Sequence, residues 1–199
     1  MTAQVGDKFR YKEEAYSVVA LSSPVKFTPI EYGIIPHGIC SACWRGYWCE
    51  YEISDEGIIL KDLYIHSKED LYPAINGVLP QEAQRRSKKW FQYMGHHLYK
   101  DVNLKIPYTG RILAGKDFIR EYGLNMGFQR AWAYGHLTEF VFADGCLLET
   151  KDHSEMAATV RRQIKEDPKG FEQELRKDIS KYVDESFSTD MKVKAWWIP

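Results

Sequence analysis

The sequence predicts an α+β fold: a mainly antiparallel β body built from two related, duplicated halves, with an inserted helix and a C-terminal pair of amphipathic helices. Three observations lead to this prediction. One segment of the chain occurs twice, apolar and polar residues alternate through much of both copies, and apolar residues recur every fourth position after residue 151. Alternation is typical of half-buried strands, and recurrence at i+4 is typical of helices that bury one face.

The repeated segment spans residues 11–60 and residues 99–148. Both copies carry Tyr-Lys, Glu-Tyr-Gly, Gly, Trp, Tyr, Glu and a turn with Asp and Gly, in that order. A duplicated unit predicts two half-structures that bury their apolar faces against each other. We therefore expect residues 1–199 to form a single globular domain, which their number permits.

Three hairpins are expected in and next to the two copies. Residues 8–20 predict a hairpin that turns at Glu13-Glu14, and Pro24, Pro29 and Pro36 then favour an irregular stretch. A second hairpin is expected around the turn at residues 54–57, and its counterpart in the other copy around residues 143–145. Asp-Gly pairs in such turns supply the positive φ angles that tight hairpins need.

Helices are expected between and after the copies. Residues 66–98 are too long for a plain loop, and Pro80 is typical of the first position of a helix, so this segment is predicted to be a helical connection. Two helices are predicted within residues 152–186, separated by Asp167 as an N-cap and Pro168 as the next first position. Residues 191–198 alternate again and predict a last strand.

The charge balance and the termini limit the class of protein. A formal net charge of −1 gives no global attraction to nucleic acid or to an anionic membrane. No signal peptide and no membrane-spanning stretch is apparent, and four cysteines are too few for a disulfide scaffold. We therefore expect a soluble, cytoplasmic protein with no membrane association, in which aromatic residues are unusually frequent.

The sequence has one partial match to a metal-site motif and one to a nucleotide-binding motif, and both give little support for such a site. Cys40 and Cys43 form one Cys-x-x-Cys pair, but a structural zinc ion needs four ligands and the second copy has no cysteines there, so no metal and no cofactor are expected.

Residues 110–116 match the phosphate-binding pattern G-x-x-x-x-G-K. Asp117 follows where Ser or Thr is needed, and residues 112–114 are typical of a strand, so nucleotide binding is not expected there.

The functional hypothesis rests on residues that the two copies place equivalently. If the halves face each other, these residues form a cleft with stacking walls, guanidinium donors and carboxylates, suited to a planar or anionic ligand or to a partner's loop. The equally open interpretation is that the aromatic members form the shared core. The predicted ligand-binding residues are Trp44, Arg45, Tyr47, Glu50, Arg130, Trp132, Tyr134, His136 and Glu139.

The sequence therefore favours a binding protein for an unidentified small molecule or protein partner. One alternative is an enzyme, of hydrolase or transferase type, that uses His136 with Glu139 or His37 with Cys40 in the same cleft. Another is a nucleic-acid-associated protein that uses the basic segment 82–93, which we interpret first as a solvated helix face. The oligomeric state does not follow from the sequence.

Overall fold

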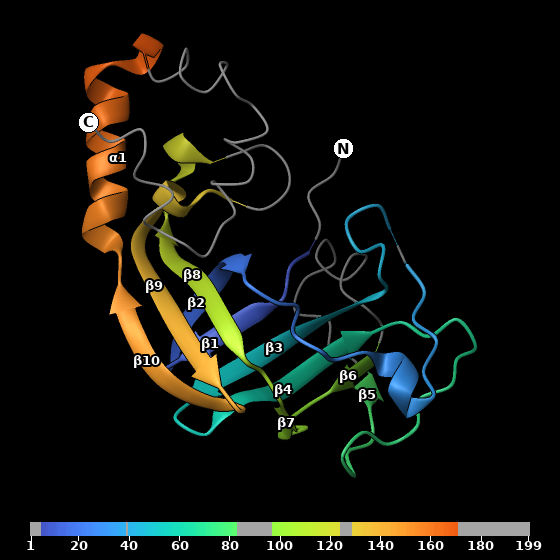
Figure 1. The fold of residues 1–199 in the computed structure, drawn as a ribbon. Coiled ribbons are helices and arrows are strands. Elements are labelled where there is room, and N and C mark those ends of the chain that lie inside the picture. The colour runs from blue at the N-terminus through green and yellow to red at the C-terminus, as the bar shows by residue number, and fades with distance from the viewer. Residues whose placement is uncertain (1–4, 39, 83–96, 124–128, 171–199) are drawn as a thin grey trace.

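The computed structural model describes residues 5–38, 40–82, 97–123 and 129–170, and these are mostly strands (Figure 1). Ten strands form one sheet in the order β10-β9-β8-β2-β1-β3-β4-β6-β5, with β7 paired to β4. All neighbouring strands are antiparallel except β1 and β3, which are parallel. The predicted β-rich, mainly antiparallel body is thereby confirmed.

The sheet begins with the predicted hairpin, made of β1 (Lys8–Tyr11) and β2 (Glu14–Leu21). Its turn lies one residue earlier than expected, at Lys12 and Glu13, which both have positive φ angles of 49° and 67°. This conformation matches the twist of a two-residue hairpin. A 3-10 helix, η1 (Pro29–Tyr32), follows, with the Thr28 side chain as its N-cap.

The second hairpin joins β3 (Tyr47–Ser54) to β4 (Gly57–Ile65), as predicted from the alternation around residues 54–57. Three short strands complete this side of the sheet. They are β5 (Gln81–Glu82), β6 (His97–Tyr99) and β7 (Leu104–Ile106).

The other side of the sheet contains β8 (Gly110–Phe118), β9 (Tyr134–Ala143) and β10 (Cys146–Asp152). Two short 3-10 helices, η3 (Arg120–Tyr122) and η4 (Ala131–Ala133), lie between β8 and β9. Asp144 and Gly145 form the β9–β10 turn with φ angles of 51° and 76°, as the sequence predicted. Residues 110–118 are one strand, so the apparent phosphate-binding pattern is not a loop.

Two hydrophobic cores lie on opposite faces of the sheet. The larger one draws side chains from both ends of the strand order, for example Phe9, Tyr51 and Phe140. The smaller one includes Leu113 and Trp132 and is covered by η4 and the helix α1 (Ser154–Glu166). Alternate residues of one strand therefore serve different cores, as side-chain alternation requires.

The tips of two hairpins touch and fold the sheet back on itself (Figure 1). The Leu147 amide donates a hydrogen bond to the Asp55 carbonyl oxygen at 3.3 Å. Gly57 has a φ of 114°, and a Cβ placed there would lie 1.9 Å from the Gly145 carbonyl oxygen. This backbone contact joins the β3–β4 tip to the β9–β10 tip and encloses the larger core.

The two predicted copies share part of their order of elements and have different strand neighbours. Residues 11–60 contain β2, η1, β3 and the start of β4, whereas residues 99–148 contain β7, β8, η3, η4, β9 and the start of β10. However, β8 pairs directly with β9, whereas β1 lies between β2 and β3. Tyr11 and Tyr99, which the alignment matches, lie on β1 and β6 respectively.

The predicted helices fall only partly on described residues. In segment 66–98, residues 83–96 lie outside the described part, and Gln81 and Glu82 form a strand where the helix was expected to begin. The first C-terminal helix is α1, and the Gly170 amide donates to Asp167 Oδ1 at 2.9 Å, as an N-cap would accept it. Residues 171–199 lie outside the description.

Among the described residues, no helix has the length and apolarity that crossing a bilayer requires.

Candidate functional site

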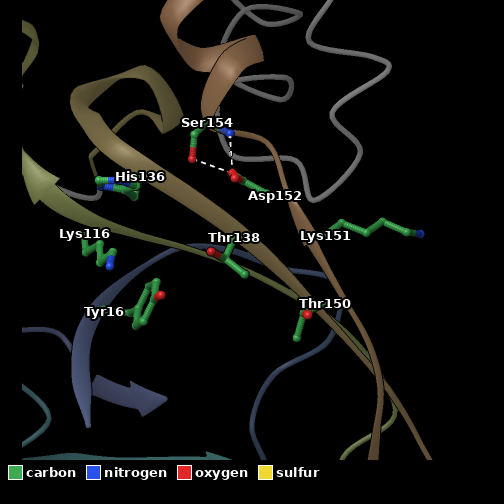
Figure 2. A pocket seen from close by; sticks show the side chains of 8 residues that line it. All are labelled: Tyr16, Lys116, His136, Thr138, Thr150, Lys151, Asp152 and Ser154. Atoms are coloured by element: carbon green, nitrogen blue, oxygen red, sulfur yellow. Dashed lines mark hydrogen bonds between the residues drawn. The ribbon is translucent and has the colours of Figure 1, made fainter. Parts of the chain in front are cut away.

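A polar hollow of about 310 Å³, open to solvent, is lined by side chains from the neighbouring strands β2, β8, β9 and β10 and from the start of α1 (Figure 2). Its walls carry ammonium, imidazole, hydroxyl and carboxylate groups, so it offers both donors and acceptors to a ligand. Lys151 extends away from the other side chains. The lining residues are Tyr16, Lys116, His136, Thr138, Thr150, Lys151, Asp152 and Ser154.

Lys116 is held in place from two sides. Its Nζ lies 2.6 Å from Glu14 Oε2 and 5.8 Å from the centre of the Tyr16 ring. The hydrogen bond with Glu14 is the main reason that the pKa of Lys116 is raised above its ordinary value and that the pKa of Glu14 is lowered. Lys116 therefore carries its positive charge throughout the physiological pH range, with a side chain that is only 22% exposed.

His136 lies directly opposite Lys116 in the β8–β9 ladder. Its Nδ1 is 2.6 Å from Asp117 Oδ2. Successive strand residues ordinarily point to opposite faces, so Asp117 and Lys116 would be expected on different sides. Asp117 has a φ of 58°, and this left-handed conformation brings its carboxylate to the same imidazole that faces Lys116. Both members of the pair are more than half exposed.

Asp152 and Ser154 close the hollow at the start of α1. Asp152 Oδ1 accepts hydrogen bonds from the Ser154 amide at 2.8 Å and from the Ser154 hydroxyl. That hydroxyl in turn accepts from the Leu137 amide at 3.1 Å. The hydrogen bonds from the Ser154 side chain, then its backbone, lower the pKa of Asp152 below its ordinary 3.8. The Ser154 hydroxyl thus connects the helix start to β9, with one hydrogen bond donated and one accepted.

Replacing Asp152 by alanine is expected to lower the free energy of unfolding by about 1 kcal/mol, as loss of an N-terminal cap does. Because the folded-state pKa of Asp152 is depressed, the carboxylate stabilises the fold above pH 3.8 and loses that effect as the pH falls further. Urea unfolding of both proteins at neutral and acidic pH measures this. A difference that persists unchanged at about pH 2 would contradict the charge-based explanation.

A second group of ionisable residues lies on the opposite face of β9. The Glu139 side chain is only 6% exposed, and its Oε2 lies 3.0 Å from His153 Nε2. Arg111 Nη1 lies 3.5 Å from the other carboxylate oxygen. His136 and Glu139 are an odd number of residues apart on one strand, so they point to opposite faces. The structure does not bring this predicted catalytic pair together.

The predicted site residues from the first copy lie elsewhere and are already bonded. Arg45 forms a bidentate pair with Asp7, donates from Nε to the Tyr47 carbonyl at 2.7 Å and stacks on the Tyr47 ring. Burial disfavours the charged guanidinium, but the bonds to Asp7 outweigh it and the pKa of Arg45 is raised. Trp44 is 76% exposed, and Glu50 pairs with Lys8 and Arg10.

Two of the five predicted residues from the second copy, Trp132 and Tyr134, belong to the smaller core. Trp132 is 1% exposed, and the Arg130 guanidinium lies 5.6 Å from the centre of its ring. Tyr134 is also buried, and burial raises the pKa of its hydroxyl. Of the nine predicted residues, His136 alone lines the polar hollow.

The cysteines and the remaining histidines do not form a recognisable centre in the described part of the chain. There, no three His, Cys, Asp or Glu side chains converge as a metal site would require. Burial raises the pKa of Cys43, so its thiol stays protonated, and the His37 ring pairs with the His66 ring 6.0 Å away. The basic segment 82–93 lies, apart from Glu82, outside the described residues.

Sequence reasoning missed most of the hollow. Lys116 and Asp117 were considered only as part of a phosphate-binding pattern, and Tyr16, Thr138, Thr150 and Asp152 carry no motif. The available signal was the alternation of β9, which places His136 and Thr138 on one face. No family model, no curated protein and no solved structure matches this chain.

Proposed function

We propose that this protein is a binding protein that holds a small anionic molecule in the polar hollow. The observation that carries the proposal is the placement of Lys116, whose ammonium group is held by Glu14, directly opposite His136 on the neighbouring strand. The class of function is the one expected from the sequence. Its site differs from the predicted cleft, because the arginines and tryptophans of that cleft are not gathered in one place.

The chemistry of the walls supports an anion with further oxygen atoms. An ammonium group has three N–H donors, and the contact with Glu14 uses one of them. Protonated His136 would add a second cationic donor, while the hydroxyls of Tyr16, Thr138 and Thr150 both donate and accept. Carboxylate or phosphate groups that also carry hydroxyls match this set.

The size of the hollow supports a small ligand. About 310 Å³ is at the lower end of the range for ligand pockets, and the hollow is open rather than enclosed. An extended aromatic or lipid molecule would remain largely in water there. Tyr16 connects the hollow to the larger core, since its ring packs edge-on against Phe140.

Binding is best tested by calorimetry and thermal unfolding with inorganic phosphate, citrate and a sugar phosphate as probes. At least one probe should bind to the native chain, with weaker binding at high salt. Lys116→Ala should weaken binding at least tenfold. The matched control is Lys61→Ala, because Lys61 is another partly covered lysine paired with a carboxylate, that of Glu52, but does not line the hollow. The proposal would be contradicted if both substitutions weakened binding equally, or if neither weakened it.

A second candidate is an acid–base enzyme that uses the Asp117–His136 pair. The short contact between Asp117 and His136 Nδ1 fixes the ring and leaves Nε2 for proton transfer, as general bases require. This pair replaces the His136–Glu139 pair predicted from the sequence. Mass spectrometry of a bound probe after incubation distinguishes the two functions. His136→Gln would stop any conversion in an enzyme, whereas a pure binding protein leaves the probe unchanged.

The same proposal includes a duplicated origin for segments 11–60 and 99–148 and a cytoplasmic location. The shared order of strand, 3-10 helix and hairpin supports the duplication. The two segments also contribute to one core, since Tyr51 and Phe140 belong to the same cluster. Expressing the two segments separately and mixing them would test whether the halves associate.

A further inference from the structure

The strand β10 forms one end of the sheet, and its outer edge carries a self-complementary pattern. The Leu147 amide at one end of the strand already bonds to Asp55, and α1 begins at Ser154 just past the other end. Between these limits, residues 148–152 are all exposed. In the described part of the chain, only β9 pairs with them.

The direction of the backbone groups follows from the hydrogen bonds. The His153 amide donates to the Leu137 carbonyl on β9 at 2.8 Å. In an antiparallel ladder, residues alternate between pointing their N–H and C=O groups toward the partner and away from it. Lys151 and Glu149 therefore bond to β9, while Asp152 and Thr150 direct their backbone groups outward. Such outward groups are a template for another strand.

The side chains of this edge select one register. Suppose that a second copy of β10 lies antiparallel to the first, with Thr150 of each chain at the two-fold axis. The two Thr150 residues then exchange N–H···O bonds, and Glu149 of each chain lies opposite Lys151 of the other. A shift that centres the axis on Glu149 places two glutamates together, and one centred on Lys151 places two lysines together. Like charges directly opposite each other are destabilising.

We propose that the outer edge of β10 is an interface at which two copies of this chain pair as antiparallel strands about a two-fold axis at Thr150. Glu149 and Lys151 are about half exposed, and they already lie 3.0 Å apart within one chain, on the same face. The second copy extends this pair into a ring of four alternating charges. The interaction is isologous, so it closes as a dimer and does not propagate.

Dimerisation has a consequence for the hollow, because Thr150 lines it. The axis at Thr150 sets the hollows of the two copies side by side. The contact between five-residue strands is small, and small interfaces are typically weak and reversible, so a dissociation constant in the micromolar to millimolar range is expected. Charged edges usually prevent pairing. Here the charges oppose every register of self-pairing near Thr150 except one.

Sedimentation equilibrium of the full chain from about 10 µM to about 1 mM measures the association. The expected result is a monomer–dimer equilibrium that weakens with salt. Glu149→Lys places lysines opposite each other and should raise the dissociation constant about tenfold or more, and Lys151→Glu should do the same with glutamates. The double variant E149K/K151E restores both opposite pairs and should regain most of the affinity.

Mixing the two single variants provides the sharpest outcome, since an all-lysine edge then meets an all-glutamate edge. The mixture should dimerise more tightly than either variant alone. Thermal unfolding of each variant checks that the fold is retained, and Glu149→Lys alone still tests the interface if Lys151→Glu unfolds. A monomer at all concentrations, or a dimer indifferent to these charges, would overturn the proposal. Neither result bears on anion binding at Lys116, which is measured separately.

Discussion

Replacing Gly57 by alanine is expected to destabilise this protein by about 3 kcal/mol or more, the range of severe steric and backbone defects. The added Cβ would lie 1.9 Å from the Gly145 carbonyl oxygen, a backbone atom that cannot rotate away. Relief requires the two hairpin tips to separate, which breaks the hydrogen bond from Leu147 to Asp55 and opens the larger core to water. The φ of 114° adds a conformational cost that only glycine avoids.

Gly77→Ala is the matched control for this substitution. Gly77 also has a positive φ, 78°, but a Cβ placed there meets no atom within 4 Å. Its replacement should therefore cost only the conformational term, about 1 kcal/mol. Urea unfolding of the two variants measures the difference, which isolates the contact between the tips. Equal losses of stability in the two variants would show that the tip contact contributes nothing.

The strands were predictable because their pattern is local. The β3–β4 and β9–β10 hairpins follow from alternation and from turn residues such as Asp144 and Gly145, and α1 follows from its i+4 spacing. The order of strands was not predictable. The parallel pairing of β1 with β3 depends on contacts between segments about forty residues apart, which periodicity does not encode.

In the candidate site, too, local geometry was predictable from the sequence, whereas contacts between distant segments were not. Alternation along β9 places His136 and Glu139 on opposite faces, so their separation could have been predicted from the strand alone. The meeting of Lys116 with Glu14, and of Arg45 with Asp7, depends on long-range pairing. Aromatic residues common to both copies were interpreted as a site or as a core. Trp132 and Tyr134 are buried, as the core interpretation expects, whereas Tyr47 is half-buried and Trp44 is exposed.

The buried contact between His153 and Glu139 is expected to be worth far more than the exposed contact between His136 and Asp117. His153→Ala leaves the Glu139 carboxylate, 6% exposed, with only the Arg111 guanidinium at 3.5 Å. Leaving a buried polar group without its hydrogen-bond partner costs roughly 1–3 kcal/mol, and more for a charged group. The variant should therefore unfold at much lower urea concentration than the native chain.

His136→Ala is the control within the same strand system. It likewise removes a short contact between a histidine and a carboxylate, but the two side chains are 58% and 65% exposed, so a loss within about 1 kcal/mol is expected. The double variant E139L/H153A tests the cause, because it removes the buried charge as well as its partner. It should recover much of the stability that His153→Ala loses, since apolar replacements of buried pairs are often neutral or stabilising. If the double variant were as unstable as His153→Ala, the loss would come from the packing of the imidazole against the start of α1, and the carboxylate would have no part in it.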